Sequence, residues 1–105
     1  MPEKRLFDKS KPRYETKGIS EELSIEYRII LWNFIEELAS EMDLDYLQVF
    51  EFKVENGDSQ IILHSQEVPE YVKEHKFPLV DEGVENKVFV IDDGDHCTML
   101  WASEY

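Results

Sequence analysis

The residue types that could do chemistry are densest in one run of six, from Asp92 to Cys97. This run brings together carboxylates, an imidazole and a thiol. Carboxylate and imidazole groups are common ligands of metal ions, so the run is a candidate metal site. Its acidic and imidazole side chains form a candidate polar cluster: Asp92, Asp93, Asp95 and His96.

The spacing within this run argues against a metal. An EF-hand calcium loop has its glycine at the sixth position, which would make Phe89 and Ile91 the first and third ligands, and neither can ligate. A structural zinc site generally needs four ligands, and the chain has only one cysteine and three histidines. Asp93-Gly94 is instead typical of a tight hairpin turn. The sequence therefore predicts a turn and no metal.

Cys97 is the single cysteine and a candidate nucleophile. It would need a neighbouring base, such as His64 or His75, to become reactive. The residues that follow it are apolar, and an unpaired cysteine in such a strand usually packs as a small hydrophobic side chain. We predict that the protein is not an enzyme, and a small enzyme that uses Cys97 with a histidine is the alternative. A groove lined by His64, His75 or His96 would favour that alternative.

No cofactor is predicted, because the chain has neither a GxGxxG nor a GxxxxGK[ST] loop to hold a nucleotide phosphate. The net charge is −13, and it is unevenly distributed. Residues 1–18 hold six basic and three acidic residues, whereas residues 19–105 hold five basic and 21 acidic residues. A body this acidic repels nucleic-acid phosphates and anionic membranes, so we expect neither as a partner. The charge indicates high solubility or, as an alternative, an acidic decoy of a nucleic-acid-binding protein.

Cysteine usage and apolar run length predict the compartment. One cysteine cannot form an internal disulfide, and small secreted domains usually carry several pairs. The first five residues run into charge without a signal-peptide pattern. No apolar run approaches the ~20 residues of a membrane-spanning helix. We expect a cytoplasmic protein.

A helix from about Ser24 to Met42 is the strongest element signal. Apolar residues recur there at three- and four-residue spacing, as on the buried face of a helix. Ser24 and Ser20 are both suitable N-caps. The stripe contains Leu23, Tyr27, Ile30, Leu31, Phe34, Leu38 and Met42.

A second apolar set lies roughly opposite this stripe, at Ile25, Ile29 and Trp32. Either the N-terminal segment, a second copy of the chain or a partner covers this patch, unless it is ordinary surface. The leading functional hypothesis is a non-enzymatic protein-interaction module, with self-association as a homodimer included, that uses this patch.

The remaining residues predict a sheet. Residues 46–55 alternate as a strand, and Asn56-Gly57 is the strongest short hairpin signal. We expect a single domain over residues 13–105, preceded by a polar basic tail at residues 1–12. The fold class is α+β in the order β-α-β-β-β-β-β, with one long helix on a largely antiparallel sheet of about five to six strands. The other strands are expected near residues 13–18, 60–66, 70–77, 87–91 and 97–101.

Several stretches together resemble a known bacterial family. They are Arg13-Tyr14 with Thr16 and Gly18, Leu31-Trp32, the run from Asp45 to Glu51, and the closing stretches at residues 90–95, 97–100 and 104–105. This family comprises small uncharacterised Firmicutes proteins, known as domain of unknown function 960, and the likeness covers about residues 12–105. The resemblance implies a bacterial, cytosolic origin and assigns no activity and no site residues.

Overall fold

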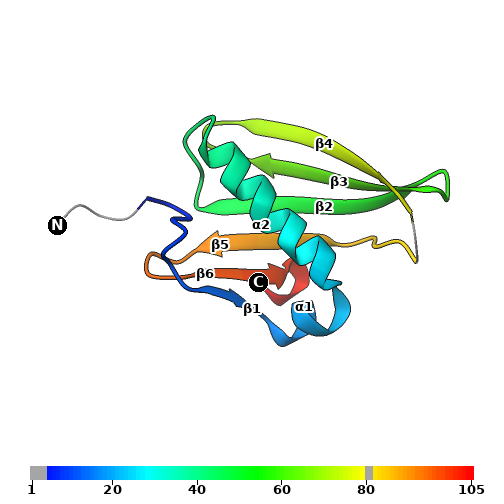
Figure 1. Cartoon of the computed structure of the whole chain (residues 1–105), viewed down its shortest axis with the longest axis horizontal. Coiled ribbons are helices and arrows are strands. Elements are labelled where there is room, and N and C mark those ends of the chain that lie inside the picture. The colour runs from blue at the N-terminus through cyan, green and yellow to red at the C-terminus, as the bar shows by residue number, and fades with distance from the viewer. Residues whose placement is uncertain (1–4, 80–81) are drawn as a thin grey trace.

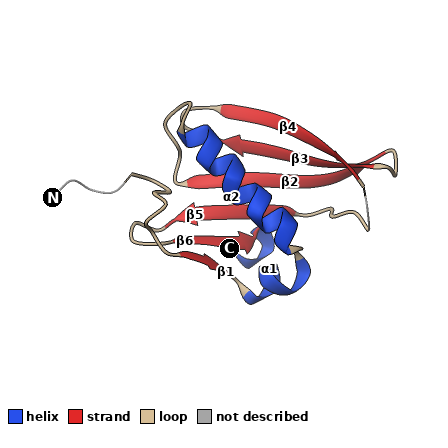
Figure 2. Ribbon diagram, in the orientation of Figure 1, coloured by secondary structure: helices blue, strands red, loops and turns tan. Residues whose placement is uncertain are grey.

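A six-stranded sheet forms one layer of the fold, and the α-helices lie on one of its faces (Figures 1 and 2). The computed structural model describes residues 5–79 and 82–105. Helix α2 crosses the sheet diagonally (Figure 1). The predicted α+β class is confirmed. The elements are β1 (Arg13–Glu15), α1 (Lys17–Glu22), α2 (Ile25–Ala39), β2 (Leu47–Glu55), β3 (Ser59–Gln66), β4 (Tyr71–Pro78), β5 (Lys87–Asp92), β6 (Cys97–Trp101) and the 3-10 helix η1 (Ala102–Glu104).

The strands lie in the order β1-β6-β5-β2-β3-β4. All neighbouring strands are antiparallel except β1 and β6, which run parallel. The hairpin between β2 and β3 turns at Asn56-Gly57, with φ angles of 55° and 72°. Positive φ at both central residues is the requirement of a type I′ turn, so the local sequence sets this register.

Helix α2 begins where the sequence predicts. The Ser24 hydroxyl accepts a hydrogen bond from the Tyr27 amide at 3.3 Å, which satisfies one of the free amides at the helix start. The helix ends at Ala39, three residues before the predicted Met42. No basic residue lies in its last turn to stabilise the carboxyl end. Among the described residues, no helix is long and apolar enough to cross a membrane.

Helix α1 was not predicted. Thr16 caps it, because its hydroxyl accepts a hydrogen bond from the Ile19 amide at 3.2 Å. The side chain of Ile19 is fully buried. A helix of six residues is too short to show an apolar period, so burial of Ile19 in the tertiary structure stabilises it.

Alternation along the strands separates the two faces of the sheet. Phe50 and Phe52 of β2 contact the rings of Phe34 and Tyr27 on α2. Their neighbours along β2 therefore point to the opposite face, which no helix covers. The buried core lies between α2 and the sheet and includes Ile19, Leu31, Trp32, Ile35, Phe50, Phe52, Ile62, Val88, Val90, Met99 and Trp101.

The N-terminal segment contributes to this core. The side chains of Phe7 and Lys11 are each 5% exposed. The sequence predicts a polar tail here, and the described part, residues 5–12, instead packs against the domain. Residues 1–4 of the predicted tail lie outside the described residues.

Candidate functional site

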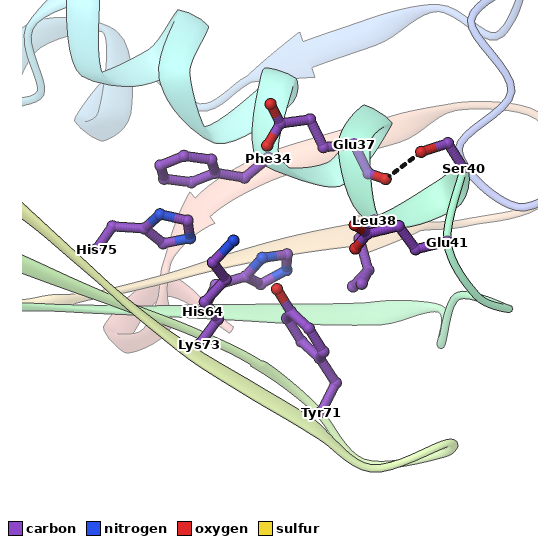
Figure 3. A pocket seen from close by; sticks show the side chains of 9 residues that line it. All are labelled: Phe34, Glu37, Leu38, Ser40, Glu41, His64, Tyr71, Lys73 and His75. Atoms are coloured by element: carbon purple, nitrogen blue, oxygen red, sulfur yellow. Dashed lines mark hydrogen bonds between the residues drawn. The ribbon is translucent and has the colours of Figure 1, made fainter.

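A pocket of about 310 Å³ opens between the second half of α2 and the strands β3 and β4 (Figure 3). Two periodicities build it. The helix side has the spacing of one helix face, and residues 71, 73 and 75 of β4 share one strand face. The lining residues are Phe34, Glu37, Leu38, Ser40, Glu41, His64, Tyr71, Lys73 and His75.

His64 is held in the floor of this pocket by a buried amide. Its Nε2 lies 2.7 Å from Oε1 of Gln48. The Gln48 amide nitrogen donates to the Asp45 carbonyl at 2.9 Å and to Oε1 of Gln66 at 2.7 Å. Because Oε1 of Gln48 is left to accept, the hydrogen-bond network assigns the His64 proton to Nε2. The acceptor nitrogen Nδ1 has no hydrogen-bond partner in the described part of the chain.

Gln66 fixes the far end of this amide chain. Its nitrogen donates to the carbonyls of Asp43 and Pro69, at 3.0 and 2.8 Å. Its Oε1 accepts from the Asp45 amide at 2.9 Å as well as from Gln48. Every donor and acceptor of the two buried glutamines is used, so the orientation of the His64 ring is defined by the loops at both ends of β2 and β3.

Both pocket histidines are neutral at neutral pH. Burial lowers the pKa of His64 to about 4, and the nearby His75 adds to the effect. Burial also lowers the pKa of His75, where Lys73 acts in the same direction and Glu37 in the opposite one. The His75 ring stacks on Phe34 with centroids 3.7 Å apart. Its Nε2 is buried and has no hydrogen-bond partner among residues 5–79 and 82–105.

The charged side chains of the pocket come from opposite walls. Glu37 and Glu41 extend from the α2 side and Lys73 from β4 (Figure 3). No described residue forms an ion pair with any of the three. Burial raises the pKa of Tyr71, and the carboxylates of Glu41 and Glu37 raise it further, so Tyr71 presents a neutral phenol.

This arrangement suits binding better than acid–base catalysis. A general base works best with a pKa near the operating pH, and His64 lies well below that. No nucleophile adjoins it among the lining residues. No group of three metal-ligating side chains forms within the described ranges, so nothing in them holds a metal ion.

The Cys97–histidine alternative is contradicted by the sheet order. Cys97 lies on β6, and His64 lies on β3, three strands away, which is roughly 14 Å at the usual strand spacing. His75 is one strand further, on β4. Burial raises the pKa of the Cys97 thiol to about 11, and Asp92 raises it while Lys11 partly opposes this. Cys97 is a packed core residue, as the sequence indicates.

The candidate polar cluster at residues 92–96 divides between two environments. Asp92 is buried and points to Lys11. Asp93 and Asp95 are exposed and lie 3.3 and 2.6 Å from the two nitrogens of His96. Adjacent residues point to opposite sides, so the four side chains do not converge on one point.

The three residues of the predicted helix patch also separate. Ile25 and Ile29 are each 53% exposed, whereas Trp32 is 7% exposed. The guanidinium of Arg13 lies 4.7 Å from the centre of the Trp32 ring. Of the two alternatives, covering by the N-terminal segment holds for Trp32, because β1 brings Arg13 over it. The exposed part of the patch is reduced to two isoleucines.

The larger apolar surface is on the open face of the sheet. Register places Leu47 beside Ile91, and Val49 beside Phe89 and Leu100 in the next row. We call these five residues the open-face patch. Its rim carries side chains that are more than half exposed: Tyr14, Val72 and Tyr105. Tyr105 reaches this face by an edge contact with Phe89.

The rest of the open face is charged but balanced. Strand residues there include three lysines and three glutamates, which are Lys53, Lys76, Lys87, Glu51, Glu55 and Glu74. Two ion pairs connect them, Lys76–Glu55 at 3.1 Å and Lys53–Glu51 at 4.0 Å. The formal charge of this face is therefore zero, and the whole net charge of −13 lies elsewhere.

The fold and these two surfaces define a two-layer α+β protein with a bare sheet face and a polar pocket beside its helix. The chain belongs to the family described as Staphylococcal protein of unknown function, domain of unknown function 960, whose model matches residues 12–104. A crystal structure of a protein of unknown function from Enterococcus faecalis is similar, with a TM-score of 0.85 and 24% identity over 97% of each chain. That likeness shows the fold alone. No curated protein matches the chain.

Proposed function

We propose that this protein is a non-enzymatic protein-interaction module that pairs with a second copy of itself through the open face of its sheet. The observation that carries the proposal is the coincidence of an apolar patch with a face of zero formal charge on a chain of charge −13. Exposed contiguous apolar surface on a soluble protein commonly marks a binding site.

Charge favours a second copy as the partner. A basic protein would be attracted to the acidic surfaces, where the net charge lies, rather than to a neutral face. Two acidic copies repel each other least when their neutral faces meet. A two-fold axis through the open face would also let the lysines of one copy meet glutamates of the other.

The geometry of the face suits such pairing. Sheets pack face to face about 10 Å apart through apolar side chains. The open-face patch provides aliphatic and aromatic groups from β2, β5 and β6, three adjacent strands. Tyr14 and Tyr105 at its rim have an apolar ring and a polar tip, which suits the edge of an interface.

The non-enzymatic part of the proposal is supported by the chemistry of the candidate groups. The thiol of Cys97 is buried with a pKa of about 11, and the best-oriented imidazole, His64, has a pKa of about 4. Neither is reactive at neutral pH. A single unpaired cysteine also supports the cytosol as the compartment.

Light scattering after size exclusion tests the pairing. We expect the wild type to be a dimer and Val49→Lys to be a monomer, because a lysine there would be buried without a partner. Lysine also reduces the net negative charge, so loss of the dimer could not be attributed to added repulsion. Raising the salt concentration should strengthen the wild-type dimer, since it screens repulsion between acidic copies.

Ile29→Lys is the matched control, because Ile29 is an exposed apolar residue on α2. It should remain a dimer, and circular dichroism should show that both variants are folded. A wild type that stays monomeric at high concentration would refute the proposal. A dimer broken by Ile29→Lys and not by Val49→Lys would move the interface to the helix.

A further inference from the structure

The pocket beside α2 has walls of opposite charge that do not meet. Glu37 and Glu41, one helical turn apart, belong to the α2 side, and Lys73 belongs to β4 (Figure 3). Long flexible side chains of opposite charge usually pair when they are within reach, yet no described residue pairs with these three. Charges held apart across a cavity suit a ligand that carries both opposite charges.

The floor of the pocket has polar atoms without partners. His64 is 1% exposed, and its Nδ1 has no hydrogen-bond partner within the described chain. Nε2 of His75 is buried and likewise unpaired there. A buried polar atom without a hydrogen bond costs about 1–3 kcal/mol, which a ligand that supplies the bond can recover. Together with the Tyr71 phenol, these atoms provide neutral donors and acceptors between the charged walls.

Size and net charge limit the ligand. A volume of about 310 Å³ is near the lower end for small-molecule pockets, which fits an amino acid better than a nucleotide. Two carboxylates and one ammonium give the lining a net charge of −1, in a protein of −13. An anion is repelled, and a simple cation meets Lys73. A zwitterion has no net charge and can contact both walls.

We propose that this pocket binds a free amino acid or a zwitterion of that class. The ligand ammonium donates to Glu37 and Glu41, and its carboxylate accepts from Lys73. The ligand side chain lies against Phe34 and Leu38. This site is on the helix-covered face of the sheet, so it is independent of pairing through the open face.

Two-dimensional ¹H–¹⁵N NMR with the twenty common L-amino acids, added singly to the full chain, tests the proposal. We expect at least one to shift the resonances of residues 71–75 and 37–41 selectively. The amine made by decarboxylating that amino acid, and the acid made by removing its amino group, should each bind about tenfold more weakly or less, since each lacks one ionic contact.

Charge-removing variants complete the test. Lys73→Gln and the double variant Glu37→Gln/Glu41→Gln should each weaken binding about tenfold or more. Lys76→Gln and Glu74→Gln are the controls, because they lie on the same strand but face the open side, and both should bind as the wild type does. Overall spectra report whether each variant is folded. Absence of selective shifts with all twenty amino acids at millimolar concentration would overturn the proposal, as would undiminished binding by the decarboxylated amine.

Discussion

The ammonium of Lys11 lies 2.8 Å from Oδ2 of Asp92, and both side chains are almost completely buried. The same oxygen accepts the Phe7 amide at 2.7 Å, and Oδ1 accepts the Gly94 amide at 2.7 Å. Burial by itself raises the pKa of Asp92, but these hydrogen bonds outweigh it and hold the pKa below its ordinary value. Asp92 thereby ties the N-terminal segment to the turn between β5 and β6.

Breaking this pair from one side should be costly. Asp92→Asn leaves the Lys11 charge buried without a counter-charge, and we expect a loss of about 3–5 kcal/mol in the free energy of unfolding. Urea denaturation followed by circular dichroism measures it. Lys11→Met combined with Asp92→Asn should recover part of the loss. Asp95→Asn, at an exposed position in the same turn, should have little effect. Equal effects of Asp92→Asn and Asp95→Asn would contradict this account.

Stability should fall on mild acidification because of His64. Its pKa is lowered from 6.5 to about 4 in the folded state, so between these pH values the unfolded chain binds a proton that the folded chain does not. The contribution is fully favourable above pH 6.5 and is lost as the pH falls toward 4. The loss approaches roughly 3 kcal/mol. Urea denaturation at several pH values should show the slope in the wild type and a shallower slope in His64→Phe. An unchanged slope in that variant would count against the shift.

Cys97 should resist thiol reagents in the folded protein. Its side chain is buried, and its pKa of about 11 leaves almost no thiolate at neutral pH. We expect labelling by an aromatic disulfide reagent to be slow in buffer and complete in denaturant. Labelling as fast as in an unfolded control would show that β6 opens readily, and it would revive a chemical role for the thiol.

Gly83 should not tolerate a side chain. A Cβ at this position would overlap Cγ2 of Val54, and valine is stiff at that torsion. Gly83→Ala should lower the free energy of unfolding by about 1–3 kcal/mol, as overpacking does. Adding Val54→Ala should restore most of it. If the double variant is as unstable as Gly83→Ala alone, the contact is not the cause.

Local signals account for the elements that the sequence predicts correctly. Ser24 caps α2 through an amide three residues away, and Asn56-Gly57 needs only its own φ angles to turn. Both depend on interactions within a few residues, which a sequence pattern contains. Alternation along β2 and β3 likewise identifies which side chains share a face, but it does not say which face the helix covers.

The pocket could be predicted only in part. His64 and His75 were identified as candidate bases for Cys97, and they lie together in the same pocket instead. Glu37 and Glu41, at helical spacing, and Tyr71 and Lys73, at strand spacing, carry a periodic signal for a shared face on each element. Nothing in the sequence places the two elements opposite each other, because the contact spans more than thirty residues of chain.

By itself, the amino-acid sequence determined the secondary structure, the acidic charge, the family and the inert character of the single cysteine. These follow from composition and from interactions between near neighbours in the chain. Tertiary structure alone decided that Trp32 is covered, that Phe7 and Lys11 enter the core, and that a neutral apolar face and a two-signed pocket exist. Strand order and the diagonal path of α2 bring those residues together, and packing of the whole core, rather than any local motif, selects that arrangement.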